Sequence, residues 1–231
     1  MVWPGKFQNA SDVEDAKQSI GSDEVAWQRE FMLRIIPNDG QVIHPDWIQC
    51  YDKLPDTKPS YIVIGVDLAI SKASTAHYTA IVSAIVYGFG GNSRTYILPN
   101  PVNKKLDFPQ TMGTIKEIYD TIDPTCSRVV CIEDVAYQAS AYQQLKEMGV
   151  RAEGIKLYGQ DKRARLALTT NYICQGKILF PSHGAEDLIN QLVNFGVEKN
   201  DDLADAFSLL TFKIISRNKI GDSFGVLISD K

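Results

Sequence analysis

Acidic residues stand at three separated places in this sequence where they could bind metal ions. Asp67 and Glu133 each directly follow a run of apolar, β-branched residues. Asp202 and Asp205 are three residues apart, so in a helix they lie on one face. Carboxylates gathered without a counter-charge repel one another, and Mg²⁺ or Mn²⁺ relieves that repulsion through oxygen ligands. Two such ions can activate a water and stabilise the leaving oxygen in phosphodiester hydrolysis. These acids therefore predict a two-metal hydrolytic site.

Each of these acids also has a purely structural explanation. Asp67 could be a turn residue after a strand, and Glu133 could pair with a lysine. Asp201 and Asp202 resemble the N-cap and first-turn acids that a helix dipole favours. Asp205 is harder to explain in this way, because it lies beside an apolar stripe in a helix that is already capped. The metal site is therefore inferred from the combination and from no single residue.

Three elements must position these carboxylates. Residues 61–66 and 128–132 are expected to be strands covered on both faces. If they are parallel neighbours, both acids lie at the same edge of the sheet, where open α/β sheets usually build their sites. The third element is a helix over 203–215, whose apolar stripe comprises Leu203, Phe207, Leu210 and Ile214.

The remaining pattern predicts a mixed central sheet, an antiparallel meander plus parallel strands, flanked by helices. Further strands are expected at 79–87, 94–98 and 150–155, and further helices at 109–121, 140–148, 162–174 and 185–195. Residues 1–58 are rich in turn formers and suggest an arm or linker. We expect the main domain to span 59–216 and a tail to follow over 217–231.

Basic residues near these acids could hold DNA phosphates. The clearest cluster comprises Lys156, Lys162, Arg163 and Arg165, and Lys72 follows Asp67 closely. The alternative is a solvated helix face, which is the usual explanation of a charge run. Phosphate contact is preferred here only because the acids already suggest a nucleic-acid substrate.

Composition narrows the class of protein. The 231 residues are 44% hydrophobic, and no apolar run is long enough to span a membrane, so we expect a soluble intracellular protein. The net charge of −4 argues against a uniformly basic DNA-binding surface. It does not exclude a nuclease, because bound metal changes the local sign of the field. The four cysteines form no C-x-x-C pair, which argues against a structural zinc site or a disulfide framework.

The acidic segments 65–69, 132–138 and 201–206 resemble, in order and spacing, the three acidic motifs of phage large terminase nuclease domains. Segments 3–7, 27–31, 161–165 and 176–181 extend the resemblance over nearly the whole chain. It implies an RNase H-like fold and an endonuclease that cuts concatemeric double-stranded viral DNA during packaging. By this resemblance Asp67, Glu133 and Asp205 are metal ligands, with Asp202 as an additional or supporting acid.

The same resemblance implies a setting. The partners would be a portal protein, a small terminase subunit and a motor ATPase domain, in the cytoplasm of an infected or lysogenic bacterial host. Two departures stand out: the chain has no G-x-x-x-x-G-K-[ST] phosphate loop, and it lacks the histidine that some relatives carry at the last motif.

Two other functions remain open from the sequence. A docking module for portal or small terminase partners would use the acids as helix caps, and it would not need Mg²⁺ or Mn²⁺. A resolvase-like recombination nuclease would use the same acids on branched DNA. Metal binding separates the first of these from the terminase nuclease, and substrate shape separates the second.

Overall fold

A mixed sheet organises the chain in the computed structural model, which describes residues 41–68, 78–123, 125–134, 139–156, 161–197 and 200–228. Among these residues the strand order is β1-β8-β4-β3-β2-β6-β7, and β5 pairs with β3. Residues from Val42 onward form one compact unit. The strands are β1 Cys50–Tyr51, β2 Tyr61–Asp67, β3 Tyr78–Tyr87, β4 Arg94–Ile97, β5 Val102–Lys105, β6 Arg128–Glu133, β7 Ala152–Ile155 and β8 Ile178–Pro181.

The sheet confirms the predicted combination of a meander and parallel strands. Strands β2, β3 and β4 are antiparallel neighbours in chain order, whereas β6 runs parallel to β2 and β7 parallel to β6. Residues 61–66 of β2 are all buried, because helices cover both faces of the sheet at this central strand.

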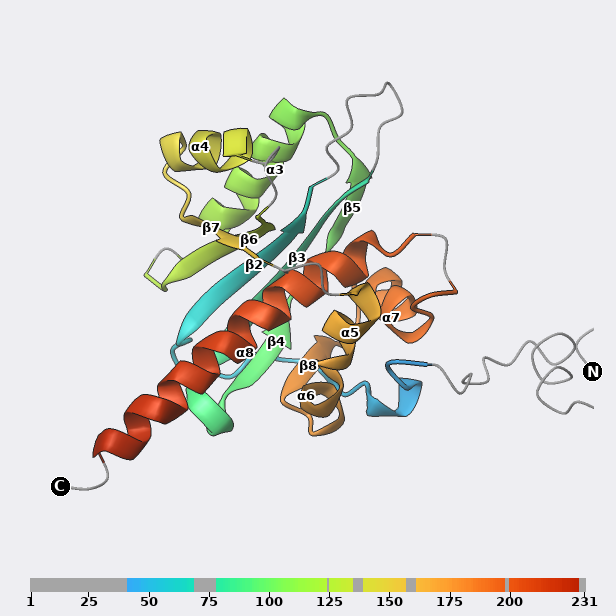
Figure 1. Cartoon of the computed structure of the whole chain (residues 1–231), viewed down its shortest axis with the longest axis vertical. Helices are drawn as coiled ribbons and strands as arrows, with labels where there is room; N and C mark the ends of the chain where they lie inside the picture. The colour runs from blue at the N-terminus through green and yellow to red at the C-terminus, as the bar shows by residue number, and fades with distance from the viewer. Residues whose placement is uncertain are drawn as a thin grey trace, which may run out of the picture. The chain divides into compact units, whose positions relative to one another are not determined.

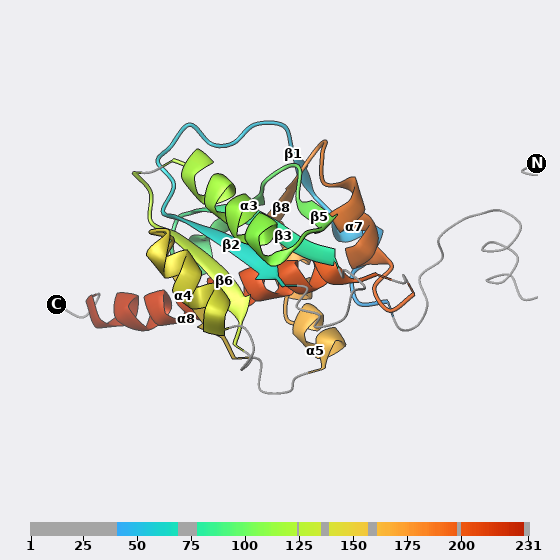
Figure 2. The same ribbon diagram turned by 90° about the horizontal axis from the view of Figure 1, so that it is seen from above.

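Helices α3 and α4 cover one face of the sheet, and the long helix α8 crosses the other (Figure 1; Figure 2). One core joins Met112, Ile115 and Leu145 to β2 and β6, and a second, larger core joins Phe207 and Leu210 to the opposite face. The helices are α3 Phe108–Thr121, α4 Ala139–Glu147, α5 Lys162–Ala167, α6 Thr170–Cys174, α7 Glu186–Val193 and α8 Asp202–Ile228, with 3-10 turns η1 Pro45–Trp47 and η2 Gly90–Asn92.

The single helix expected over 162–174 is two helices in the structure, α5 and α6. Thr169 lies at the junction, and its hydroxyl donates a hydrogen bond to the Leu166 carbonyl at 2.7 Å. Thr170 donates in the same way to the carbonyl of Ala167 at 2.8 Å. Such short-range side-chain bonds compete with the helical backbone pattern, which explains the break.

Both ends of the expected main domain extend further in the structure. Strand β1 lies within the segment expected as an arm and pairs in parallel with β8, and Val42 and Ile43 are buried in the larger core. At the other end, α8 continues to Ile228 through most of the expected tail. Within the described part of the chain, no helix has both the length and the apolarity needed to cross a membrane.

Candidate active site

Strands β2 and β6 place Asp67 and Glu133 side by side. The parallel register pairs Val66 with Ile132, so the next residue on each strand falls in the same row. Adjacent strands are roughly 4.8 Å apart, and residues in one row point to the same face. Tyr61 and Val63 pack in the core beneath α8, and alternation along β2 puts Asp67 on that face as well. The two strands are therefore parallel neighbours, as predicted, and their terminal acids lie at the same edge of the sheet.

A glycine on β2 allows α8 to lie close to the sheet. A Cβ at Gly65 would stand 2.2 Å from the Ala206 carbonyl oxygen and 2.8 Å from the Leu210 Cβ. No larger side chain fits there without displacing the helix. The close approach brings the first turn of α8, which carries Asp202 and Asp205, to the edge of the sheet where β2 ends.

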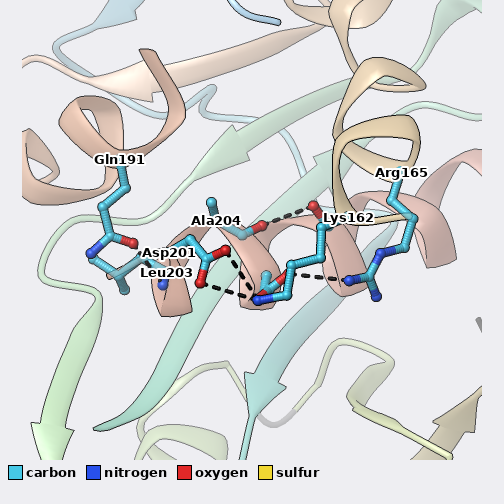
Figure 3. A network of polar contacts seen from close by, with 8 residues as sticks. Lys162, Arg165, Gln191, Asp201, Leu203 and Ala204 are labelled. Atoms are coloured by element: carbon cyan, nitrogen blue, oxygen red, sulfur yellow. Dashed lines mark hydrogen bonds and ion pairs between the residues drawn. The ribbon is translucent and has the colours of Figure 1, made fainter. Parts of the chain in front are cut away.

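The start of α8 is fixed from a neighbouring helix. The buried Gln191 side chain on α7 accepts a hydrogen bond from the Leu203 backbone N–H at 2.9 Å (Figure 3). This contact satisfies one of the N–H groups that a helix leaves unpaired at its first turn. The helix dipole also favours negative charge at this end, which reduces the cost of gathering acids there.

The pKa of Asp67 reflects the negative charges of the other acids. Its pKa is raised to about 7, first by burial and then by the charges of Asp205 and Asp202, with a smaller contribution from Glu133. The positive charge of Lys162 acts in the opposite direction. The predicted acids thus form one electrostatically coupled group.

Asp205 is paired with two cations. Its Oδ2 lies 2.5 Å from the Lys162 Nζ, and its Oδ1 accepts a hydrogen bond from the Arg165 Nη2 at 3.2 Å. Burial raises the pKa of Asp205, although Lys162 opposes that shift. Lys162 also reaches both oxygens of Asp201, at 3.0 and 3.1 Å, as Figure 3 shows. Burial lowers the pKa of Lys162, but its contacts with Asp205 and Asp201 outweigh burial and raise it overall.

The predicted DNA-contacting cations are in different environments. Arg163 is exposed on α5, and Lys156 is exposed beyond β7, with its Nζ 3.9 Å from Asp134. Lys162 is half-exposed and ion-paired, and Arg165 is buried against Asp205. Lys72 lies outside the described residues. The sequence analysis did not predict that Lys162 and Arg165 contact the acids. The available signal was their spacing of three residues, which puts both side chains on one face of a helix.

The donor chemistry of this group fits a hard divalent cation. It consists of carboxylate oxygens, and the pKa of Asp67 is raised first by burial and then by the negative charges of Asp205 and Asp202. A divalent cation would relieve the repulsion between these charges. The side chains that would hold it are those of Asp67, Glu133, Asp202 and Asp205. Within the described part of the chain, no three acidic, histidine or cysteine side chains already stand in a metal-binding group. Lys162 instead lies on Asp205.

Comparison with known proteins supports the fold. No protein-family model and no curated protein matches the sequence. Among solved structures, the large terminase nuclease from thermophilic phage G20c with bound magnesium is 12% identical, with a TM-score of 0.53 over 77% of this chain and 99% of that one. The form of the same nuclease with bound zinc gives a TM-score of 0.51 at 12% identity, over 73% and 95% of the two chains.

A large terminase also matches. The HK97 bacteriophage large terminase is 11% identical, with a TM-score of 0.50 over 89% of this chain, which spans 51% of that protein. These three matches, among others, are two forms of a large terminase nuclease and one large terminase. At these identities the similarity establishes the architecture alone, and the chain has the RNase H-like fold of phage large terminase nuclease domains.

Proposed function

We propose that this chain is a Mg²⁺- or Mn²⁺-dependent endonuclease that cleaves double-stranded viral DNA concatemers during genome packaging. The observation that carries the proposal is that the ends of β2 and β6 and the first turn of α8, which carry these acids, lie at one edge of the sheet. The terminase nuclease fold supports the choice of DNA as the substrate.

The residues divide into a group that holds metal and a group that holds DNA. Asp67, Glu133, Asp202 and Asp205 are the proposed ligands, and Asp67 must lose the proton that its raised pKa retains near neutral pH. A bound Mg²⁺ or Mn²⁺, or a pair of such ions, would supply Lewis-acid stabilisation of charge on the scissile phosphate. The exposed cations Arg163 and Lys156 are the proposed contacts to backbone phosphates.

The setting follows from the resemblance and the fold. We propose that a motor ATPase domain, a portal protein and a small terminase subunit work with this nuclease in the cytoplasm of the bacterial host. Cleavage is expected to show weak base preference, since contacts to phosphates carry no sequence information.

Plasmid digestion tests the nuclease proposal. The purified chain is incubated with supercoiled and linear plasmid in Mn²⁺, Mg²⁺ or EDTA, together with Asp67→Asn and Glu133→Gln. Cutting is expected only with metal, and each variant should lose roughly 100-fold or more of it because a ligand is removed. Asp120→Asn, which neutralises an exposed acid on α3, is the matched control and should cut normally. Metal-dependent cutting that survives unchanged in folded Asp67→Asn would exclude this site.

One observation favours a second function. Lys162 and Arg165 already neutralise Asp205, as they would if the acid were structural. A non-catalytic docking module for packaging proteins would keep these ion pairs and would bind no divalent ion. Absence of both Mn²⁺ binding and cleavage in the folded chain would favour the docking module.

A further inference from the structure

The two cations on Asp205 are held in different ways. The Arg165 side chain is 9% exposed and that of Asp205 11% exposed, so their hydrogen bond is almost completely removed from solvent. The Lys162 side chain is 49% exposed. One oxygen of the Asp205 carboxylate therefore contacts the buried Arg165, and the other contacts Lys162, which solvent can reach.

Arg165 is fixed by its surroundings. It follows the helical turn that begins at Asp161, whose carbonyl accepts the Arg165 backbone N–H at 3.0 Å. Its planar guanidinium lies among buried residues, and within the described part of the chain its Nε has no hydrogen-bond partner. Displacing this group from Asp205 would leave a second buried donor unpaired, which is costly. Arg165 is therefore suited to hold Asp205 in one orientation.

Lys162 can leave without such a cost. Its ammonium is a point charge on a flexible stem, and its contacts with Asp201 lie at the surface, where the Asp201 side chain is 35% exposed. A lysine that moves from Asp205 keeps Asp201 as a partner and gains water. The oxygen that it uncovers, Oδ2 of Asp205, belongs to the same coupled group as Asp67.

We propose, on the basis of the proposed function, that Lys162 is the replaceable counter-ion of the metal site. In the metal-free protein its ammonium occupies Oδ2 of Asp205, and a divalent cation must displace it to bind. Arg165 is a positioning residue that keeps Oδ1 of Asp205 engaged in both states. The metal and Lys162 thus compete for one carboxylate oxygen, and this competition sets the metal affinity of the resting protein.

Calorimetric titration with Mn²⁺ in the absence of DNA tests the competition. Lys162→Met is expected to bind Mn²⁺ about tenfold more tightly than the unmodified chain. In this variant the metal no longer has to break the hydrogen bond from Lys162 to Asp205, and one charge-assisted hydrogen bond corresponds to an effect of about this size. In EDTA the same variant should unfold at a lower temperature, and saturating Mn²⁺ should raise that temperature by more than in the unmodified chain.

Two matched controls separate displacement from a general change in charge. Arg163→Met removes a positive charge from the adjacent, exposed position on α5, and Lys116→Met removes a distant lysine that pairs with Asp120 on α3. Both are expected to change Mn²⁺ affinity less than twofold, since neither charge must leave for metal to bind. An equal increase in Arg163→Met would overturn the proposal, as would unchanged or weaker binding by Lys162→Met.

The result is distinguishable from failure of the nuclease proposal. Tighter Mn²⁺ binding by Lys162→Met without cleavage by any variant would support the counter-ion and contradict the nuclease. Metal-dependent cleavage with equal Mn²⁺ affinity in Lys162→Met and the unmodified chain would support the nuclease and contradict the counter-ion.

Discussion

Asp67 lies where its negative charge is unfavourable, at the end of a buried strand and beside other acids. Its folded-state pKa of about 7 exceeds its ordinary value of 3.8, so the folded, metal-free protein binds this proton more tightly than the unfolded chain does. The contribution of Asp67 to the free energy of unfolding therefore falls as pH rises from about 4 to about 7. Under the proposed function, the carboxylate that would hold metal is therefore one whose charge destabilises the metal-free fold.

Asp67→Asn should remove this pH dependence. In EDTA at pH 8 the variant is expected to be more stable than the unmodified chain by about 1–3 kcal/mol, and at pH 4 the difference should vanish because Asp67 is then protonated. Urea unfolding at the two pH values measures the effect. A stability difference that is the same at both would show that the Asp67 charge is not the cause.

The sequence predicted part of this arrangement of side chains. Asp67 and Glu133 are recognisable because each follows a buried apolar run, and the parallel pairing of the runs brings them together. The contact between Arg165 and Asp205 joins residues 40 apart, and only tertiary packing decides it. For that reason Lys162 and Arg165 were predicted to contact DNA, whereas in the structure they contact the acids. DNA contact by these residues remains a prediction.

At the scale of elements, the approach of α8 to β2 determines whether the acids meet. Gly65→Ala would place a methyl group 2.2 Å from the Ala206 carbonyl oxygen, so helix and strand must separate. We expect a loss of about 3 kcal/mol in unfolding free energy together with weakened metal-dependent cleavage. Chemical denaturation and plasmid digestion measure the two effects.

Gly113→Ala is the control for that substitution. Gly113 is exposed within α3, and a Cβ there meets nothing within 4 Å. Alanine is the better helix former, so this variant should gain up to about 1 kcal/mol and cut DNA normally. Equal losses of stability and cleavage in both variants would show that the effect of Gly65→Ala comes from a general sensitivity to glycine replacement and not from the contact with α8.

Elements differ in how well the sequence predicts them. Long strands and helices such as β3 and α3 agree with the expected ranges within a residue, because many positions repeat their apolar pattern. Strands β1 and β8 were not expected, because they pair with each other across 130 residues of sequence, which a local apolar pattern does not report. The division between α5 and α6 depends on hydroxyl contacts that apolar periodicity does not report.

At the scale of the whole molecule, the core reaches into the segment expected as an arm. Ile43 is fully buried in the larger core, together with residues of α8 and β8. Ile43→Ala is therefore expected to cost about 2–4 kcal/mol, as for other buried large-to-small substitutions. Leu168→Ala, at a 52% exposed position, should change stability by less than about 0.5 kcal/mol. Thermal or urea unfolding of both variants measures the difference, and an Ile43→Ala variant as stable as Leu168→Ala would contradict it.

The architecture was predictable although no family model matches and the similar structures are only 11–12% identical. The order of three short acidic segments predicted the terminase nuclease fold, because their acids lie at two strand ends and at the start of a helix. The predicted boundary at residue 58 rested on turn-forming composition, which does not reveal that Ile43 is buried.

The proposed ligands are spread along the chain, with Asp67 at the end of β2, Glu133 at the end of β6 and Asp202 and Asp205 at the start of α8. During translation, the ribosome therefore adds the α8 acids after all eight described strands. Under the proposed function, a growing chain that ends before α8 carries only part of its ligand set. Under the same proposal, the metal site is complete only after α8 has been synthesised.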